Sequence, residues 1–335
     1  SYTAGINIIF QYNHFGSLRE GADGNNLKDR SAGLVVRYNW IESGNRQLDL
    51  VDAEDSEVLV NHPNYHSTHV YGNILIEPDG AGNSQIVHYG GDSGTLDDYR
   101  KGDLYFYNNT IISTRSGFTT LLRLSTNDET AHVFNNVIYT TATGSNFAMI
   151  NGDGTFNMNH NWLKENWVDC HCGTVAGVLN DLGNNITGDD PLFENFANQE
   201  FRPISSSPLK NQGDAIPSQL LPNHDVIFEY VKHQDYTDRI LYGNMEIGAF
   251  EFSEPLSVSQ QKVDLIEIYP NPVSNVINIA ATQTIDKVEI YDLLGKLVLK
   301  TIHTNTIKVN HLPNGIYLLK IFADGKSITK KIVIQ

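Results

Sequence analysis

A short phrase recurs six times along this chain, each time with an Asn followed two residues later by an apolar residue. The copies read IIFQYNHF, LVVRYNWI, HVYGNIL, LYFYNNTI, HVFNNVI and FNMNHNWL, and their aligned asparagines are Asn13, Asn39, Asn73, Asn109, Asn136 and Asn161. Subtracting these numbers gives spacings of 26, 34, 36, 27 and 25 residues. Such a period is typical of stacked structural repeats and excludes a set of independent hairpins.

Each phrase alternates apolar and polar side chains and is rich in Val, Ile, Tyr and Phe, which predicts a strand with one buried face. One repeat alone cannot bury that face, but coils wound on top of one another share a continuous core. The pattern therefore predicts an all-β chain folded as a β-solenoid. We expect each Asn to adopt the left-handed backbone of a tight corner and to hydrogen-bond from coil to coil.

Length and charge narrow the possible functions. The 335 residues allow two domains, and the net charge of −16 argues against a general nucleic-acid binder, which needs a basic surface. No run reaches the roughly 18 apolar residues of a membrane span. The chain shows no signal peptide and opens on a strand-like phrase, so we expect a processed or truncated form. We also expect a monomer.

The solenoid phrases are separated by longer polar excursions at residues 52–68, 77–101 and 113–129, where binding sites on rigid scaffolds are usually found. From Gly188 the pattern changes to phrases that resemble the closing segment of bacterial right-handed parallel β-helix proteins. The matching residues are Asp190, Pro191, Phe193, Phe201, Arg202, Ser207, Pro208, Ile247, Gly248, Ala249, Phe250 and Glu251, with Pro203 in place of a Leu. The resemblance implies a right-handed parallel β-helix over residues 1–252 whose last part caps the final coil.

A polar segment, residues 253–264, is predicted to be a linker. Residues 265–335 contain short alternating strands separated by Asn-Pro, Gly-Lys, Asn-Gly and Asp-Gly turns, which predicts a small antiparallel β-sandwich. This segment resembles the type IX secretion C-terminal sorting domain of Bacteroidetes. The residues that carry the resemblance are Tyr269–Pro272, Asn278, Val288–Asp292, Gly295, Lys296, Leu312, Asn314–Tyr317 and Lys330–Gln335. It implies contact with that secretion machinery, export across the outer membrane, and release or anchoring at the cell surface.

Candidate chemistry is concentrated near the start of the chain. The segment Asn13–Ser56 resembles a recurrent segment of bacterial β-helix proteins with the form G-H-x-x-K-S-R-A, then a Y-N-x-I strand and an x-D-L strand. Gly24, Lys28, Arg30, Tyr38, Asn39, Ile41, Asp49 and Leu50 match it, whereas Asn25, Asp29 and Ser31 replace its His, Ser and Ala.

Lys28 and Arg30 are two residues apart, so in a strand both side chains lie on one face, which we expect to be the outer one. Asp49 follows Lys28 by 21 residues, one short coil, and is predicted to lie beside it. Such a pair suits a lyase acting on a uronate polymer. Arg30 or Arg37 would neutralise the carboxylate, and Lys28, its pKa lowered by nearby cations, would remove the adjacent proton. β-Helix lyases related to alginate and chondroitin lyases use a Lys and Arg pair in this way.

Further residues of this cluster, His14, Arg19 and Arg46, are predicted to bind the acidic polysaccharide. Three alternatives remain open. The charges could form only exposed ion pairs, each contributing about 0–1 kcal/mol. A glycoside hydrolase would need two carboxylates about 5–9.5 Å apart, for which Asp49 and Asp52, three residues apart, are the candidates. A non-catalytic carbohydrate-binding or adhesin solenoid would need only an exposed groove with aromatic residues. The reaction requires no cofactor, but Ca²⁺ could be held by Asp49, Asp52, Glu54 and Asp55.

Other residues give weaker indications. Cys170 and Cys172 are predicted to form a local disulfide or to remain free thiols in preference to holding a metal. His66, His69 and His88 could hold a metal ion, but they are predicted to be exposed loop residues because no third ligand is defined. Tyr99, Trp40, Trp162 and Trp167 could line a sugar groove or pack inside the coils. The working hypothesis is a secreted protein that processes extracellular polysaccharide, by lysis of a uronate polymer.

Overall fold

The computed structural model describes residues 1–253, 266–281, 284–323 and 326–335. The chain divides into two compact units, residues 1–253 and 254–335, and each is considered by itself. The predicted linker, residues 253–264, lies outside the described residues except for its first position.

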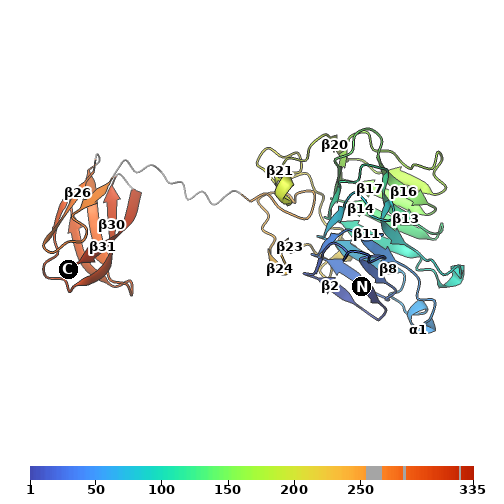
Figure 1. Ribbon diagram of the computed structural model, residues 1–335, viewed down its shortest axis with the longest axis horizontal. Helices are drawn as coiled ribbons and strands as arrows, with labels where there is room; N and C mark the ends of the chain where they lie inside the picture. The colour runs from blue at the N-terminus through green and yellow to red at the C-terminus, as the bar shows by residue number, and fades with distance from the viewer. Residues whose placement is uncertain (254–265, 282–283, 324–325) are drawn as a thin grey trace. The chain divides into compact units, whose positions relative to one another are not determined.

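The first unit is a parallel β-helix built from three parallel sheets, as predicted. Sheet I contains β1 (Tyr2–Thr3), β4 (Leu27–Asp29), β7 (Leu48–Leu50), β10 (Gln85–Tyr89), β13 (Thr119–Leu124) and β16 (Phe147–Gly152). Sheet II contains β2 (Ile9–Gln11), β5 (Val35–Arg37), β8 (Ser67–Tyr71), β11 (Gly102–Tyr107), β14 (Glu129–Phe134), β17 (Thr155–Asn159) and β19 (Val178–Asp181). Sheet III contains β3 (His14–Phe15), β6 (Trp40–Glu42), β9 (Ile74–Glu77), β12 (Thr110–Ser113), β15 (Val137–Thr140), β18 (Trp162–Lys164) and β20 (Ile186–Gly188). Figure 1 shows β2, β8, β11, β14 and β17 stacked in order, with the short helix α1 (Glu57–Val60) in an excursion.

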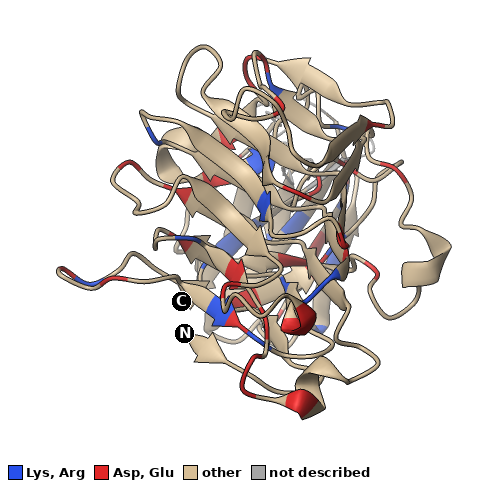
Figure 2. Cartoon of the chain, turned by 90° about the vertical axis from the view of Figure 1, so that its right-hand side faces the viewer, with Lys and Arg blue, Asp and Glu red and all other residues tan. Residues whose placement is uncertain are grey.

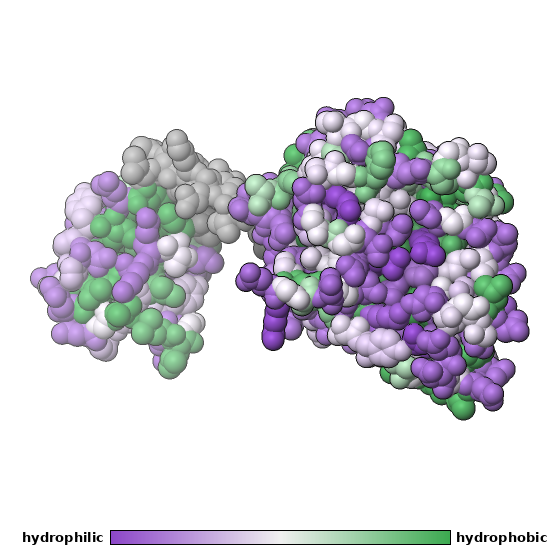
Figure 3. Space-filling model, turned by 45° about the vertical axis from the view of Figure 1, so that its right-hand side comes forward, coloured by the Kyte–Doolittle hydropathy of each residue, from purple (hydrophilic) through white to green (hydrophobic). Residues whose placement is uncertain are grey.

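The core of the β-helix is a set of apolar columns, because alternate residues of every strand face inward. In sheet I the column of Leu27, Leu48, Val87, Leu122 and Ile150 runs through five coils, and each of these side chains is at most 1% exposed. On sheet I the intervening, outward positions include the polar residues Lys28, Asp49, His88 and Arg123. Figure 2 shows acidic and basic residues spread over strands and loops, and the surface in Figure 3 is largely hydrophilic.

The repeated asparagines form a hydrogen-bonded ladder, as predicted. Asn39 is typical, since its backbone N–H and its side-chain amide both donate to Oδ1 of Asn73, over 3.0 and 2.9 Å. The ladder continues past Asn161 to a seventh member, Asn185, which the sequence pattern missed. The predicted left-handed backbone was placed one residue too late, because it belongs to the residue before each Asn, such as Tyr38 with φ 53°.

The segment from residue 189 to 253, here called the flanking segment, was predicted to cap the final coil. It instead runs along the side of the β-helix from the last coils to the first. Leu209 packs with Trp162, the Tyr107 hydroxyl donates to the His224 carbonyl over 2.6 Å, and Tyr236 stacks on Tyr12. Large aromatic side chains on the outer faces of sheets II and III explain this path, because the flanking segment removes them from water.

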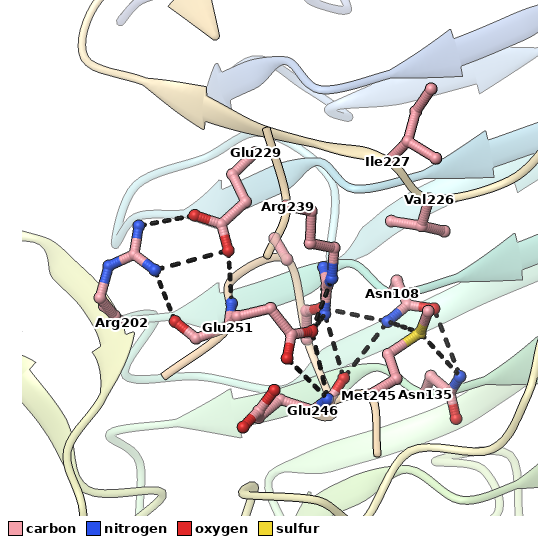
Figure 4. A network of polar contacts seen from close by, with 12 residues as sticks. Asn108, Asn135, Arg202, Val226, Ile227, Glu229, Arg239, Met245, Glu246 and Glu251 are labelled. Atoms are coloured by element: carbon pink, nitrogen blue, oxygen red, sulfur yellow. Dashed lines mark hydrogen bonds and ion pairs between the residues drawn. The ribbon is translucent and has the colours of Figure 1, made fainter. Parts of the chain in front are cut away.

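Buried charges hold the flanking segment together (Figure 4). Arg239 and Glu251 form an ion pair that is almost fully buried, and the Arg202 guanidinium pairs with Glu229 over 2.6 Å. The side-chain amide of Asn108, on the β-helix, donates to the carbonyls of Glu246 and Gly248. The strands of this segment are β21 (Phe193–Asn195), β22 (Glu200–Pro203), β23 (Phe228–Val231) and β24 (Asp235–Asp238).

The second unit is built from two antiparallel sheets, in agreement with the predicted β-sandwich. One contains β25 (Glu267–Tyr269), β26 (Val276–Ala280) and β29 (Thr306–Lys308), and the other contains β27 (Ile285–Tyr291), β28 (Leu297–Ile302), β30 (Gly315–Ala323) and β31 (Lys326–Ile334). Alternating apolar side chains such as Ile277, Val288, Ile290 and Leu319 pack between them.

Candidate functional site

The densest polar cluster lies on the outer face of sheet I. The strand register places Lys28 beside Asp49, Asp49 beside His88, and His88 beside Arg123. Four successive coils thus contribute charged or titratable side chains to one row. The predicted proximity of Lys28 and Asp49 is confirmed, with Nζ and Oδ2 3.4 Å apart.

Asp49 is the centre of this cluster and is only 1% exposed. Its Oδ2 accepts a hydrogen bond from the Asn25 amide over 2.6 Å and faces Lys28, while its Oδ1 contacts Arg46 Nη1 at 3.5 Å and His88 Nδ1 at 2.9 Å. Burial raises the pKa of Asp49, but the hydrogen bond from His88 and the nearby positive charges outweigh burial and lower this pKa below its usual value. Asp49 is therefore held as a carboxylate.

Lys28 does not have the lowered pKa predicted for a general base. Burial lowers the pKa of Lys28, but the ion pair with Asp92, together with the charges of Asp49 and Asp92, raises it above its usual value. Asp92 belongs to the loop after β10, 64 residues from Lys28 in the chain, so residue spacing did not predict this second carboxylate. Arg30 also lies beside Asp92, and it pairs with Glu54 over 2.5 Å.

The other predicted contributors are divided among the sheets. Arg46 belongs to the cluster on sheet I, but Arg37 lies on β5 of sheet II, where it donates to Gln11 and to the Tyr71 hydroxyl. His14 lies on β3 of sheet III and stacks on His233, with ring centroids 3.8 Å apart. Arg19 lies exposed in a loop outside the cluster. The predicted grouping of Arg37 with Lys28 is therefore wrong, because a corner separates the two strands.

The predicted Ca²⁺ ligands have other partners. Asp49 contacts the basic side chains described above. Asp52 accepts a hydrogen bond from the Asp92 amide over 2.8 Å, and Glu54 pairs with Arg30. Within the described ranges, no group of three or more His, Cys, Asp or Glu side chains could hold a metal ion. Cys170 and Cys172 form a disulfide, one of the two states predicted for them.

Sequence reasoning did not place Asp92, Arg123, His88 or Ser125 in the cluster on sheet I. His88 was expected in an exposed loop, but it lies on β10 and is 2% exposed. Its Nδ1 faces Asp49, and its Nε2 lies 2.8 Å from the Ser125 hydroxyl. Polar residues at successive outward positions could have indicated this cluster, but they can be aligned from the sequence only when the length of each coil is known.

A second polar surface lies between sheet II and the flanking segment, and we call it the sheet II groove. The rings of His69, Tyr105 and His132 stack on adjacent strands, with centroids 5.1 and 4.9 Å apart. Two hollows follow this row, with volumes of about 440 and 110 Å³. Their polar lining residues are Asn7, Asn64, Ser67, His69, Asn223 and His224 in the larger, and Tyr105, His132, Asn157, Asn159, Asp214 and Gln219 in the smaller.

His69 and His224 stack face to face at the larger hollow, with centroids 3.6 Å apart. Burial and the proximity of His224 lower the pKa of His69 to about 3, so His69 is neutral at ordinary pH. The Nδ1 atoms of both rings are buried without a hydrogen-bond partner among the described residues. Both atoms are shielded from solvent, so the accessible edges of these rings offer the hollow mainly apolar surface for stacking.

The aromatic residues that were candidates for sugar stacking do not line this groove. Trp40 and Trp162 are at most 1% exposed, because Phe201 and Tyr230 cover Trp40 while Leu209 and Ile247 pack on Trp162. Both tryptophans are therefore buried, but under the flanking segment on the outer face of sheet III and not inside the coils.

Comparison with known proteins characterises the second unit. Residues 267–335 match the family model of the secretion system C-terminal sorting domain. No curated protein matches the chain. In the part of the chain that the structure describes, no helix has the length and apolar character needed to cross a membrane. The prediction of a type IX sorting domain is confirmed, and with it export across the outer membrane to a secreted or surface-attached state.

Proposed function

We propose that the β-helix unit binds an extracellular polysaccharide along the sheet II groove. The observation that carries this proposal is the row of two hollows beside stacked rings from successive coils. Neighbouring strands of a sheet repeat every 4.7–4.9 Å or so, which places similar polar groups at regular steps along the axis. A linear chain of sugar rings presents hydroxyl groups in a similarly regular row.

The groove lining favours an uncharged polymer over the uronate polymer predicted from the sequence. The polar groups among the lining residues are mainly amides, imidazoles and hydroxyls, interspersed with apolar side chains such as Val35 and Phe134, and the charged residue is Asp214. Such groups both donate and accept hydrogen bonds and therefore suit sugar hydroxyls. An anionic chain would meet no compensating cation in this lining.

Lysis of a uronate polymer stays a prediction. Its proposed base, Lys28, lies between Asp49 and Asp92 with a raised pKa, so the ammonium form is stabilised and proton removal is disfavoured. Hydrolysis of glycosidic bonds by Asp49 and Asp52 likewise stays a prediction. Hydrogen bonds within the protein disfavour it, since they already occupy Asp49 and one oxygen of Asp52.

Binding to a panel of neutral and acidic polysaccharides, measured by affinity electrophoresis and calorimetry, tests the proposal. We expect Tyr105→Ala and His132→Ala to weaken binding to a neutral polymer at least 10-fold. The matched control is Phe118→Ala, because Phe118 is 60% exposed and does not line the groove. Tryptophan fluorescence verifies that each variant is folded. Equal losses in all three variants, or binding to none of the polymers, would refute the proposal.

A further inference from the structure

Three side chains from successive coils of sheet I form a line that the proposed polysaccharide binding does not use. Asp49 follows Leu48 in β7, His88 lies opposite it on β10, and Ser125 directly follows β13. Asp49 Oδ1 lies 2.9 Å from His88 Nδ1, and His88 Nε2 lies 2.8 Å from Ser125 Oγ. These contacts join a carboxylate, an imidazole and a hydroxyl in the order used by serine nucleophiles.

The surroundings of Asp49 fix the proton positions in this line. Because Asn25, Lys28 and Arg46 contact the carboxylate, it remains ionised and accepts the Nδ1–H of His88. Burial lowers the pKa of His88, and this effect outweighs its bond to Asp49, so the ring is neutral at ordinary pH. Its Nε2 then carries a lone pair and can accept the proton of the Ser125 hydroxyl.

Ser125 combines this contact with partial access to solvent. Ser125 is half-buried, whereas Asp49 and His88 are at most 2% exposed. The Gly91 amide donates to Ser125 Oγ over 3.1 Å, and the Gly91 carbonyl offers a second acceptor at 3.1 Å. These two contacts with Gly91 hold the Ser125 oxygen in position beside His88.

We propose that Ser125 is a nucleophile, activated by His88 and Asp49, that hydrolyses carboxylic esters. The Ser125 oxygen forms a bond to the ester carbonyl carbon while its proton passes to His88 Nε2. The bond from that carbon to the alkoxy oxygen then breaks, and His88 returns the proton to the leaving alcohol. Water, deprotonated by His88, attacks the acyl-serine, releases the carboxylic acid and restores the hydroxyl.

Two arginines beside this line indicate an ester that carries a negative charge. Arg123 is exposed and lies in register with His88 on the outer face. The Arg46 side chain is 13% exposed, and its Nε is buried without a hydrogen-bond partner among the described residues. The Arg123 guanidinium can bind a carboxylate or another anion attached to the substrate, and the charge of Arg46, which contacts Asp49, adds to the attraction of that anion.

A fluorophosphonate probe tests the nucleophile directly, with mass spectrometry of the full chain locating the labelled residue. We expect labelling at Ser125 that is lost in Ser125→Ala and reduced at least 100-fold in His88→Asn. Ser67 is the matched control, because its hydroxyl lies 3.3 Å from His69 Nε2 but the Nδ1 of His69 has no carboxylate partner among the described residues. Ser67 should stay unlabelled.

Hydrolysis of 4-nitrophenyl acetate and of the anionic 4-nitrophenyl succinate tests the activity and its preference. We expect faster turnover of the succinate, no turnover by Ser125→Ala, and a loss of the preference in Arg123→Ala. Absence of a label at Ser125 in the folded wild-type chain, or unchanged hydrolysis by Ser125→Ala, would overturn the proposal. Polysaccharide binding is measured on the same preparations, and because it uses a different sheet, the two proposals can fail separately.

Discussion

Acid should destabilise the β-helix unit through one buried imidazole, His69. This side chain is 9% exposed and lies between the rings of Tyr105 and His224, with centroid distances of 5.1 and 3.6 Å. Burial, followed by the proximity of His224, lowers the pKa of His69 from 6.5 to about 3. The unfolded chain therefore binds a proton at this position over a pH range in which the folded chain does not.

The sign and size of the effect follow from this difference. A depressed folded-state pKa contributes stability that is present above pH 6.5 and is lost as the pH falls toward 3. Each pH unit inside this window costs about 1.4 kcal/mol of unfolding free energy. Allowing for partial protonation near pH 6.5, His69 alone should remove about 2 kcal/mol between pH 6.5 and 4.5.

Urea unfolding followed by tryptophan fluorescence measures this loss. The three tryptophans of the chain all lie in the first unit, so the signal reports on the β-helix. His69→Phe keeps a stacked ring but cannot titrate. The difference in unfolding free energy between wild type and this variant should fall by about 2 kcal/mol from pH 6.5 to 4.5 and stay constant from pH 7 to 8. Parallel curves for the two proteins across the acid range would refute the reasoning.

Three further predictions concern stability, each measured by urea unfolding. Asn73→Ala removes donors and acceptors from a fully buried rung and should cost about 3–5 kcal/mol, whereas Asn13→Ala, at the half-buried end of the ladder, should cost about 1 kcal/mol. Similar costs would contradict the ladder. Arg100→Met leaves a buried carboxylate unpaired and should cost about 3–5 kcal/mol, so a cost below about 1 kcal/mol would show that the pair is dispensable. Replacing both Cys170 and Cys172 by Ser should change stability by less than about 1 kcal/mol, because the disulfide closes a very short loop, and a larger loss would show that this loop supports the coils.

The β-helix could be predicted from the sequence because its determinants recur. Alternation specifies which face of each strand is buried, and the Asn ladder marks one corner per coil. The seventh rung, Asn185, was missed because the residues before it, Asn-Asp-Leu-Gly-Asn, do not alternate. The path of the flanking segment was also missed, since outward aromatic residues such as Tyr107 do not reveal which segment will cover them.

The outer face of sheet I was only partly predictable, for a geometrical reason. Lys28 and Asp49 are one short coil apart, so their contact followed from spacing alone. Arg37 is only nine residues after Lys28, but a corner turns it onto another sheet. The number of residues between two side chains therefore predicts their contact when it equals the length of one coil. It is misleading when the chain turns a corner between them.

The longer steps along sheet I explain why the line from Asp49 to Ser125 escaped prediction. The register joins Asp49 to His88 after 39 residues and His88 to Arg123 after 35, because excursions of different length interrupt these coils. The strand register, in which the buried residues Leu48, Val87 and Leu122 are aligned, decides which outward residues become neighbours. The Lys28 and Arg30 pair identified from the sequence therefore did not reveal these more distant neighbours. Lys28 contacts the carboxylate that faces His88, so under the proposed ester hydrolysis its part is to position that carboxylate.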